Sequence, residues 1–460
     1  MGRAKAWFGT DGIRGIANQE PMSPMTLLNV GKAVVKVFQD AYPGKTVKVV
    51  VGRDTRISGF MIESALAAGI CSQGGRVRLV GEMPTAGIAF TTMTMRADAG
   101  IMISASHNPF EDNGVKIFSS DGSKISEEWE KRIEYLLEHE DFSEGVTGRL
   151  IQRAKSISDA PGRYSEHLKN TFPQTESLKG LKIVLDCANG AAYRVAPLVF
   201  EELNAELIVI NDEPDGTNIN KHCGATSPKA LRECVIREKA DIGIALDGDA
   251  DRAIFIDHRG ELQDGDTMIA ICADAMNELH RLRNKTVVVT QMSNYGFELA
   301  MRKRKIQVIR TDIGDRYVVA EMKKRKCNLG GEQSGHVIFF DHGNTGDGIV
   351  TALQVLAVMQ KKGKTLSELS TIVEKIPQIL VNVKVKEKRP ISTLDETSEM
   401  IRKLQKKLSN RGRILVRYSG TENLARIMIE GKNESEIKTY ADEVADQLKK
   451  ELNQPSSHVK

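Results

Sequence analysis

The chain has 460 residues, of which 40% are hydrophobic and 27% charged, with a formal net charge of +4. One hydrophobic core rarely serves more than about 250 to 300 residues, so we expect three or four domains. The composition is that of a soluble globular protein and excludes a disordered or fibrous chain. The nearly balanced charge argues against a large nucleic-acid surface, and no apolar run approaches the roughly 18 residues of a membrane span. We therefore expect neither a nucleic acid nor a membrane as a partner.

Two further features indicate a cytoplasmic protein. The first 16 residues lack the continuous apolar core of a signal peptide. The cysteines are widely scattered without a C-x-x-C pair, which is typical of reduced thiols rather than of a disulfide framework or a structural zinc site. They are Cys71, Cys187, Cys223, Cys234, Cys272 and Cys327.

A pattern of strand, helix and strand occurs three times. It begins with a β-branched run at 47–51, continues with a helical stretch at 60–71, and returns to a strand at 77–80. The same order recurs over 183–210 and over 287–309. We interpret this as a threefold internal repeat, with three unrelated α/β segments as the alternative.

Each unit is followed by an apolar segment that ends in a polar loop. The loops lie at 104–109, at 247–252 and at 330–336. Because ligands of open α/β sheets gather beyond the carboxyl ends of strands, we expect each loop to carry chemistry.

The pattern changes near residue 377. Short strands are predicted at 380–385, 414–416 and 427–429, and the last helix carries an apolar stripe at spacings of three and four. We predict an α/β protein with three related α/β domains and a smaller C-terminal α+β domain. The expected domains are residues 1–155, 156–256, 257–372 and 373–460.

Three aspartates alternate directly after a predicted buried strand: Asp247, Asp249 and Asp251. Such closely spaced carboxylates repel one another unless a hard cation lies among them, so the motif predicts a divalent metal site. An EF-hand is excluded, because its sixth and twelfth positions would be Arg252 and His258 rather than Gly and Glu. A solvated acidic turn is the alternative.

The other polar loops are less specific by themselves. The loop around Ser106 could present a nucleophile or form only a side-chain-stabilised turn, and without a G-x-S-x-G elbow a hydrolase is disfavoured. The loop at 330–336 suits sugar hydroxyls through Glu332, Ser334 and His336. The segment at 417–422, with Arg426 nearby, suits a phosphate dianion, with a surface turn as the alternative.

Together these motifs resemble the α-D-phosphohexomutase family, in the same order over nearly the whole chain. Residues 8–15 are similar to its N-terminal signature. The resemblance implies mixed sheets and four domains around one cleft, a phosphoserine at Ser106, and one Mg²⁺ ion. The expected metal ligands are Ser106, through its phosphate, and Asp247, Asp249 and Asp251.

The resemblance also implies roles for other side chains. Lys116 and His336 are the expected general base and acid, and Arg14 and Arg252 the expected partners of the transferring phosphoryl group. The expected substrate-binding residues are Glu332, Ser334, Arg417, Ser419, Gly420, Thr421 and Arg426, of which 417–421 resemble a phosphate clamp.

Within the family, Gln333 and the segment 218–224 resemble the branch that acts on amino-sugar phosphates. Tyr418 and Asn423 depart from that branch, where lysine and proline are more frequent. The implied reaction interconverts glucosamine 6-phosphate and glucosamine 1-phosphate through a 1,6-bisphosphate, which is also the expected activator. We expect a hinge near residue 375.

Three other functions stay open. They are a mutase of glucose or mannose phosphates, a catalytically inactive sugar-phosphate sensor, and a metal-dependent phosphatase. A small phosphosugar is the expected partner, and a homodimer is one assembly to be tested.

Overall fold

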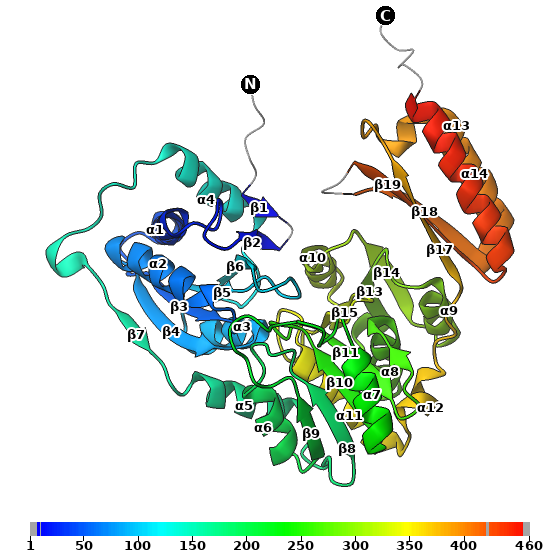
Figure 1. Cartoon of the computed structure of the whole chain (residues 1–460), viewed down its shortest axis with the longest axis horizontal. Helices are drawn as coiled ribbons and strands as arrows, with labels where there is room; N and C mark the ends of the chain where they lie inside the picture. The colour runs from blue at the N-terminus through cyan, green and yellow to red at the C-terminus, as the bar shows by residue number, and fades with distance from the viewer. Residues whose placement is uncertain (1–6, 10, 420–422, 454–460) are drawn as a thin grey trace, which may run out of the picture. The chain divides into compact units, whose positions relative to one another are not determined.

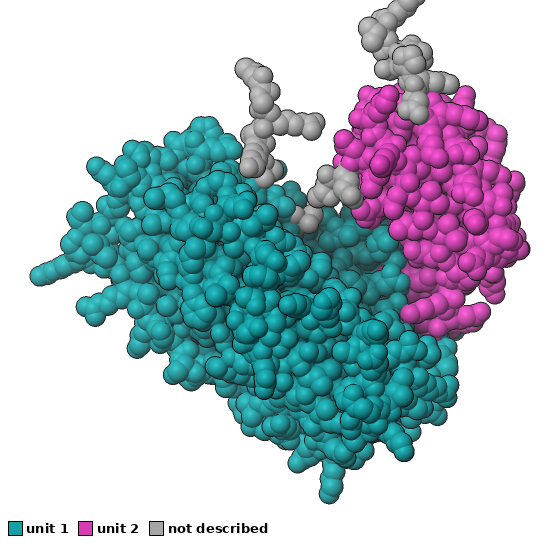
Figure 2. Space-filling view, viewed as in Figure 1, with its two compact units in different colours: residues 1–292, 304–372 teal, residues 293–303, 373–460 magenta. Residues whose placement is uncertain are grey.

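The computed structural model describes residues 7–9, 11–419 and 423–453. The chain divides into two compact units, coloured separately in Figure 2. The first comprises residues 1–292 and 304–372, and the second comprises residues 293–303 and 373–460. The first unit holds three sheets and the second holds one (Figure 1).

The first sheet has seven strands in the order β1-β2-β6-β5-β3-β4-β7. Its strands are β1 (Phe8–Gly9), β2 (Gly12–Ile16), β3 (Lys48–Arg53), β4 (Arg76–Glu82), β5 (Ala99–Ile103), β6 (Asp112–Ser119) and β7 (Ala154–Ser156). The helices of this region are α1 (Pro24–Ala41), α2 (Ser58–Ser72), α3 (Thr85–Thr94), α4 (Glu127–His139) and the short η1 (Gly148–Leu150).

The second sheet has the order β12-β11-β10-β8-β9. Its strands are β8 (Lys182–Asp186), β9 (Glu206–Ile210), β10 (Ile242–Leu246), β11 (Ala253–Asp257) and β12 (Leu262–Gln263). The accompanying helices are α5 (Ala160–Thr171), α6 (Val195–Glu202) and α7 (Lys229–Glu238).

The third sheet has the order β14-β13-β15-β16. Its strands are β13 (Thr286–Thr290), β14 (Gln307–Thr311), β15 (Leu329–Gly331) and β16 (Val337–Phe339). The helices of the first unit in this region are α8 (Gly265–Glu278), η2 (Arg283–Lys285), α10 (Asp315–Arg325), α11 (Gly348–Lys362) and α12 (Leu366–Ser370).

The three sheets share one strand arrangement. In the first, β3 pairs in parallel with β4 and β5, and β5 pairs antiparallel with β6. The second repeats this with β8, β9, β10 and β11, and the third with β13, β14, β15 and β16. The common order supports the threefold repeat, and the antiparallel fourth strand makes each sheet mixed, as predicted.

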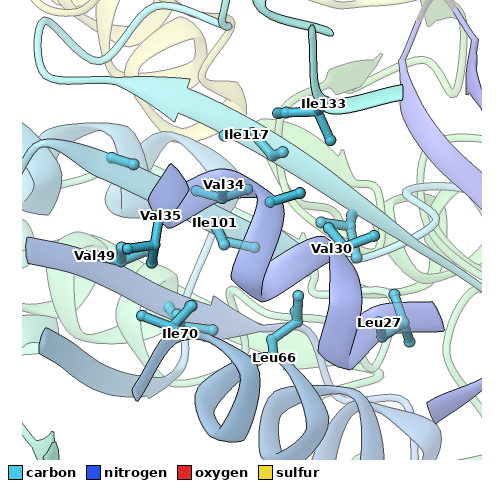
Figure 3. Close-up of a cluster of buried hydrophobic side chains, with 14 of the residues drawn as sticks. Leu27, Val30, Val34, Val35, Val49, Leu66, Ile70, Ile101, Ile117 and Ile133 are labelled. Atoms are coloured by element: carbon cyan, nitrogen blue, oxygen red, sulfur yellow. The ribbon is translucent and has the colours of Figure 1, made fainter. Parts of the chain in front are cut away.

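The core of the first sheet shows why these segments fold as they do. Helix α1 begins at Pro24, where the side chain of Ser23 accepts a hydrogen bond from the backbone N–H of Thr26. Its apolar face packs on α2 and on the sheet (Figure 3). The two helices approach closely because a Cβ on Gly69 would lie 1.9 Å from the carbonyl oxygen of Leu28. This packing holds β3 and β5, and therefore the loops that follow them.

The second unit has a three-stranded antiparallel sheet, β17-β19-β18. Its elements are α9 (Tyr295–Lys303), β17 (Gln378–Lys384), η3 (Ile391–Thr393), α13 (Asp395–Leu408), η4 (Ser409–Arg411), β18 (Gly412–Tyr418), β19 (Leu424–Gly431) and α14 (Glu434–Asn453). The predicted apolar stripe on the last helix is buried, as Ile437, Ala441, Val444, Leu448 and Leu452.

Two further predictions bear on the whole chain. All six cysteines are free thiols. In the described parts of the chain, no helix is both long enough and apolar enough to cross a membrane.

Candidate active site

The three predicted loops meet in the first unit. Ser106, after β5, donates a hydrogen bond from Oγ to Oδ2 of Asp247, after β10, at 2.7 Å. His336, after β15, places Nδ1 3.5 Å from Oδ1 of Asp251. Residues more than 200 positions apart therefore form one cluster of hydroxyl, carboxylate and imidazole groups.

Ser106 is buried and adopts φ +52°, in the left-handed region. Non-glycine residues rarely adopt this conformation, because Cβ approaches the following carbonyl oxygen. The backbone N–H of Ser106 donates to Oγ of Ser104 at 2.8 Å. Oγ of Ser106 also lies 3.3 Å from Nδ1 of His107. The hydroxyl is thus turned toward the acidic loop.

Asp247, Asp249 and Asp251 form a buried carboxylate triad rather than a solvated turn. One oxygen from each residue lies within 4.8 Å of the others. Burial and then the charges of Asp251 and Asp249 raise the pKa of Asp247 well above its usual range. Oδ1 of Asp249 is buried and accepts no hydrogen bond from the described part of the chain. Three convergent carboxylates with an unsatisfied oxygen fit a hard divalent cation.

Lys116, on β6, is fully buried beside this triad. Its Nζ lies 2.8 Å from Oδ2 of Asp249, 3.2 Å from Oδ2 of Asp251 and 3.5 Å from Oδ2 of Asp11. Burial alone would lower the pKa of Lys116, but the three carboxylates outweigh it and raise that pKa well above its usual range. Lys116 is therefore a buried lysine with three carboxylate partners.

His336 is buried between two carboxylates. Its Nε2 lies 3.8 Å from Oδ2 of Asp315, while Nδ1 faces Asp251. Burial would lower the pKa of His336, but Asp251 and Asp315 outweigh it and raise that pKa to about 9. With this pKa the imidazole carries a proton at neutral pH.

Arg14 and Arg252 line the same site. Arg14 donates from Nη1 to the carbonyl oxygen of Ala105 at 3.3 Å, and Nη1 of Arg252 lies 3.3 Å from Nδ1 of His107. Each guanidinium has a buried Nε without a hydrogen bond to any described residue, and that of Arg252 lies 3.7 Å from Oδ1 of Asp251. These donors are suited to phosphate oxygens.

Glu332 and Ser334 lie on the loop between β15 and β16. Glu332 is half-buried and accepts a hydrogen bond at Oε1 from the backbone N–H of Gly314 at 3.2 Å. Ser334 is exposed and donates to Oε2 of Glu332 at 3.3 Å. Gly335 adopts φ +95°, and a Cβ there would lie 2.4 Å from the carbonyl oxygen of Ala253, which requires glycine at this turn.

The predicted phosphate clamp belongs to the second unit. Arg417 on β18 is directly opposite Arg426 on β19. Burial and the charge of Arg426 lower the pKa of Arg417, and two adjacent guanidinium groups of this kind attract an anion. Ser419 is buried, and its backbone N–H donates to the carbonyl oxygen of Leu424 at 2.8 Å. Gly420 and Thr421 lie outside the described residues.

Comparison with known proteins follows the same division of the chain. Four family models of phosphoglucomutase/phosphomannomutase match in order. They are the alpha/beta/alpha domain I over residues 5–144, domain II over 162–260, domain III over 264–376, and the C-terminal domain over 380–447.

The chain belongs to the phosphoglucomutase/phosphomannomutase family.

It is therefore an enzyme, a phosphohexomutase of the isomerase class. Curated relatives called phosphoglucosamine mutase include one from Pelobacter propionicus, 52% identical over 97% of this chain and 99% of the relative. Another, from Bdellovibrio bacteriovorus, is 51% identical over 97% of this chain and 98% of the relative.

Solved structures of the phosphohexomutase fold agree with the architecture. A phosphoglucomutase/phosphomannomutase family protein from Burkholderia thailandensis has a TM-score of 0.82 at 22% identity, covering 98% of both chains. The N-acetylphosphoglucosamine mutase of Aspergillus fumigatus, solved with GlcNAc-6P and magnesium, has a TM-score of 0.65 at 20% identity, covering 97% of this chain and 96% of that one.

Several buried or half-buried charges at this phosphohexomutase site were not predicted as site residues. Lys124 bridges Oδ1 of Asp11 at 2.6 Å and Oδ2 of Asp315 at 2.7 Å. Asp54 and Arg56 follow β3 and contact the loop that carries Ser106. Asp54 and Arg56 could have been predicted as site residues from the sequence, because they follow the carboxyl end of the first strand of the repeat, where ligand-facing residues gather.

Proposed function

We propose that the chain interconverts glucosamine 6-phosphate and glucosamine 1-phosphate. The observation that carries the proposal is the buried hydroxyl of Ser106, 2.7 Å from Asp247 in the carboxylate triad. Relatives called phosphoglucosamine mutase, about half identical over nearly the full length, support the amino sugar as substrate.

The proposed reaction has two phosphoryl transfers. In the first, the bond between phosphorus and Oγ of phosphorylated Ser106 breaks, and a bond forms between phosphorus and O1 of glucosamine 6-phosphate. The O1 proton leaves to a base, an acid protonates Oγ, and the product is glucosamine 1,6-bisphosphate. After this intermediate turns around, the bond between phosphorus and O6 breaks and a bond forms between phosphorus and Oγ of Ser106. The Oγ proton leaves to a base, an acid protonates O6, and glucosamine 1-phosphate is released. Such transfers need positioning and charge neutralisation more than covalent assistance.

The proton transfers are assigned to Lys116 and His336. With a pKa of about 9, His336 carries a proton at neutral pH and suits the general acid. Lys116 and His336 both contact Asp251, so both groups lie at the carboxylate triad, where the reacting hydroxyl is proposed to bind. Arg14 and Arg252 direct guanidinium groups toward the same region and would contact the oxygens of the transferring group.

The triad suits a Mg²⁺ ion, with the Ser106 phosphate as a further ligand. Bound there, Mg²⁺ would neutralise charge on the phosphoryl oxygens and compete with Lys116 for Asp249 and Asp251. A cation beside the Lys116 ammonium lowers its pKa, which is what the role of general base requires.

The phosphate that does not react is assigned to the clamp. Arg417, Ser419 and Arg426 support this, together with Gly420 and Thr421 beyond the described residues. Glu332 and Ser334 are assigned to the sugar hydroxyls. The bisphosphate would also act as activator by loading Ser106. A cytoplasmic location is proposed with this role, because the product supplies amino-sugar nucleotide synthesis.

A coupled assay with Mg²⁺ tests the proposal. Glucosamine 6-phosphate is supplied alone and in competition with glucose and mannose 6-phosphates, to the native chain, to Ser106→Ala and to Ser64→Ala, an exposed serine on α2. We expect preference for the amino sugar, its loss in Ser106→Ala and its retention in Ser64→Ala. Preference for a neutral hexose phosphate would favour the second candidate, a phosphoglucomutase or phosphomannomutase. Full activity of Ser106→Ala would refute the phosphoserine mechanism.

A further inference from the structure

In the loop of residues 104–112, here called the serine loop, the residue with a strained backbone is Ser106, the proposed phosphoryl carrier. Ser106 has φ +52°, a conformation that the surrounding structure must impose on a non-glycine residue. The segments that impose it come from the end of β3 and from the second sheet's loops.

Arg56 binds the serine loop through its whole guanidinium group. The side chain is fully buried. Nη2 donates to the carbonyl oxygens of Ser106 at 2.9 Å and Asn108 at 2.8 Å, and Nη1 donates to those of Asp112, at 3.1 Å, and Pro109. Nε donates to Asp54, so all five guanidinium N–H groups are used.

Asp54 connects the same arginine to the other side of the Ser106 peptide. Its Oδ2 accepts from Nε of Arg56 at 2.9 Å and from Oγ of Ser104 at 2.6 Å. Oγ of Ser104 in turn accepts from the backbone N–H of Ser106 at 2.8 Å. One buried ion pair therefore holds both the N–H and the C=O of Ser106.

A loop in the region of the second sheet adds a further contact. Nδ2 of Asn220 donates to the carbonyl oxygens of Ser106 at 2.9 Å and Asn108 at 3.2 Å. A buried ion pair stabilises a fold little more than apolar packing would. The arrangement of Arg56 is better explained by the geometry that it gives the loop, since in-line phosphoryl transfer depends on alignment.

We infer that Asp54 and Arg56 are positioning residues that hold Ser106 in its left-handed conformation, so that Oγ faces the carboxylate triad. The inference rests on the proposed role of Ser106 as the phosphoryl carrier. Neither residue would touch the substrate. The expected consequence of disturbing them is a slower phosphoryl transfer at unchanged substrate binding.

Two variants and one matched control test this. Arg56→Lys keeps the charge but, as a point donor, cannot bind four carbonyl groups. Ser104→Ala removes the acceptor of the Ser106 N–H and the hydroxyl donor to Asp54, and leaves the ion pair between Asp54 and Arg56. Arg53→Lys is the control, because Arg53 is also buried and ion-paired, with Glu82 at 3.0 Å, yet makes no hydrogen bond to the serine loop.

Turnover of glucosamine 6-phosphate is measured with Mg²⁺ and glucosamine 1,6-bisphosphate, together with the phosphorylated fraction of Ser106 and the hydrogen exchange of residues 104–112. We expect kcat to fall about 10²-fold in Arg56→Lys and about tenfold in Ser104→Ala, with KM within about twofold, since small misplacements of reacting groups have effects of this size. Exchange in the serine loop should accelerate in both variants and not in Arg53→Lys.

Several outcomes would overturn the positioning role of Asp54 and Arg56. Native kcat in folded Arg56→Lys, or an equal loss in Arg53→Lys, would overturn the inference. If Arg56→Lys fails to fold, Ser104→Ala decides, and its native kcat would overturn the inference. An unaltered chain that never carries phosphate on Ser106 would overturn the proposed function and the inference with it, whereas an active native chain with equally active variants would overturn the inference alone.

Discussion

Asp249 is the member of the carboxylate triad that links it to two neighbouring elements. Its Oδ2 accepts from Oγ1 of Thr85 at 2.6 Å and from Nζ of Lys116 at 2.8 Å, while Oδ1 accepts no hydrogen bond among the residues that the structure describes. If the triad binds Mg²⁺, the ion must stabilise the folded chain, by about 2.7 kcal/mol at a concentration of 100 Kd. We predict that Mg²⁺ raises the thermal melting temperature of the native chain and leaves that of Asp249→Asn unchanged.

Asp257 provides the control for this measurement. It is a buried aspartate at the end of β11, and its carboxylate accepts backbone hydrogen bonds from Arg259 and Glu261 within its own turn. Asp257→Asn should lose stability but keep the Mg²⁺ response. A Mg²⁺ response in Asp249→Asn as large as in the native chain would show that the ion binds elsewhere.

A substitution of Arg417 tests the proposed phosphate clamp. Lysine keeps the positive charge but cannot form the bidentate contact that a guanidinium makes with phosphate. We predict that Arg417→Lys raises KM for glucosamine 6-phosphate about tenfold, equivalent to roughly 1.4 kcal/mol of binding, with a smaller change in kcat. Steady-state kinetics measure this, with Arg402→Lys on the exposed side of α13 as control. An unchanged KM would contradict the clamp assignment.

At the scale of elements, helix α11 supports the loop that carries the carboxylate triad through its first turn. Asp347 caps the helix by accepting from the backbone N–H groups of Ile349 and Val350, and it accepts from the hydroxyl of Tyr164 at 2.6 Å. The next residue, Gly348, donates its N–H to the carbonyl oxygen of Ala250, inside the triad, at 2.9 Å.

Loss of the cap should therefore affect both stability and activity. Asp347→Ala is expected to lower the free energy of unfolding by roughly 0.5 to 2 kcal/mol, and Tyr164→Phe, which keeps the cap, by about 1 kcal/mol. Urea denaturation measures the change, and the same samples are assayed for turnover. If Asp347→Ala lost stability without any loss of kcat, α11 would support the fold but not the loop.

Helix α5 carries His167, which contacts Phe90 on helix α3. The ring of His167 stacks on Phe90 with centroids 4.4 Å apart. Burial lowers the pKa of His167 from 6.5, against the opposing charge of Asp347 and a contact with the backbone of His342. Burial likewise lowers the pKa of His342.

The sign of the effect follows from the direction of these pKa shifts. A histidine with a depressed pKa is neutral in the folded chain while the unfolded chain binds a proton below about pH 6.5. We predict that unfolding becomes easier as the pH falls below about 6.5, and that His167→Gln reduces this slope. Melting temperatures between pH 5 and 8 measure it, with His139→Gln on the exposed end of α4 as control. If the melting temperature depended equally on pH in the native chain and in His167→Gln, His167 would not be the source of this pH dependence.

Across the whole molecule, the predictable features are those encoded over short stretches of chain. The buried strand before Asp247, the apolar stripe from Ile437 to Leu452 and the repeated strand, helix and strand pattern all depend on residues within one element or its neighbour. Periodicity and carboxylate spacing therefore predict the three similar sheets, the C-terminal α+β unit and the triad.

The features that escaped prediction join distant parts of the chain. Lys124 meets Asp315 across 191 positions, and Arg56 meets Asn108 across 52. A lone charged residue in a sequence is equally compatible with solvent and with a buried partner, and only the assembled sheets decide between them. The roles predicted for the site residues, such as Lys116 and His336, and the predicted domain boundaries stay predictions.

The placement of helix α9 was also not predicted. This helix lies between β13 and β14 in sequence but belongs to the second compact unit. Nδ2 of Asn294 donates to the carbonyl oxygen of Ile376 and to Oε1 of Glu430, both at 3.0 Å, and Oδ1 accepts from the N–H of Ile376 at 3.0 Å. A hinge predicted near residue 375 must then be accompanied by two further flexible points, at 292–293 and 303–304.

Asn294→Ala tests whether α9 moves with the second unit during turnover. Because hinge changes alter kcat and KM together, we predict a fall in kcat/KM of roughly tenfold, with Ser106 still phosphorylated by the bisphosphate. Hydrogen exchange in 293–303 should accelerate, because the segment loses the Asn294 hydrogen bonds to Ile376 and Glu430. Asn170→Ala, exposed on α5, should change neither quantity. Faster exchange in α9 with native kcat/KM would mean that the attachment of α9 is dispensable and that the hinge near 375 suffices.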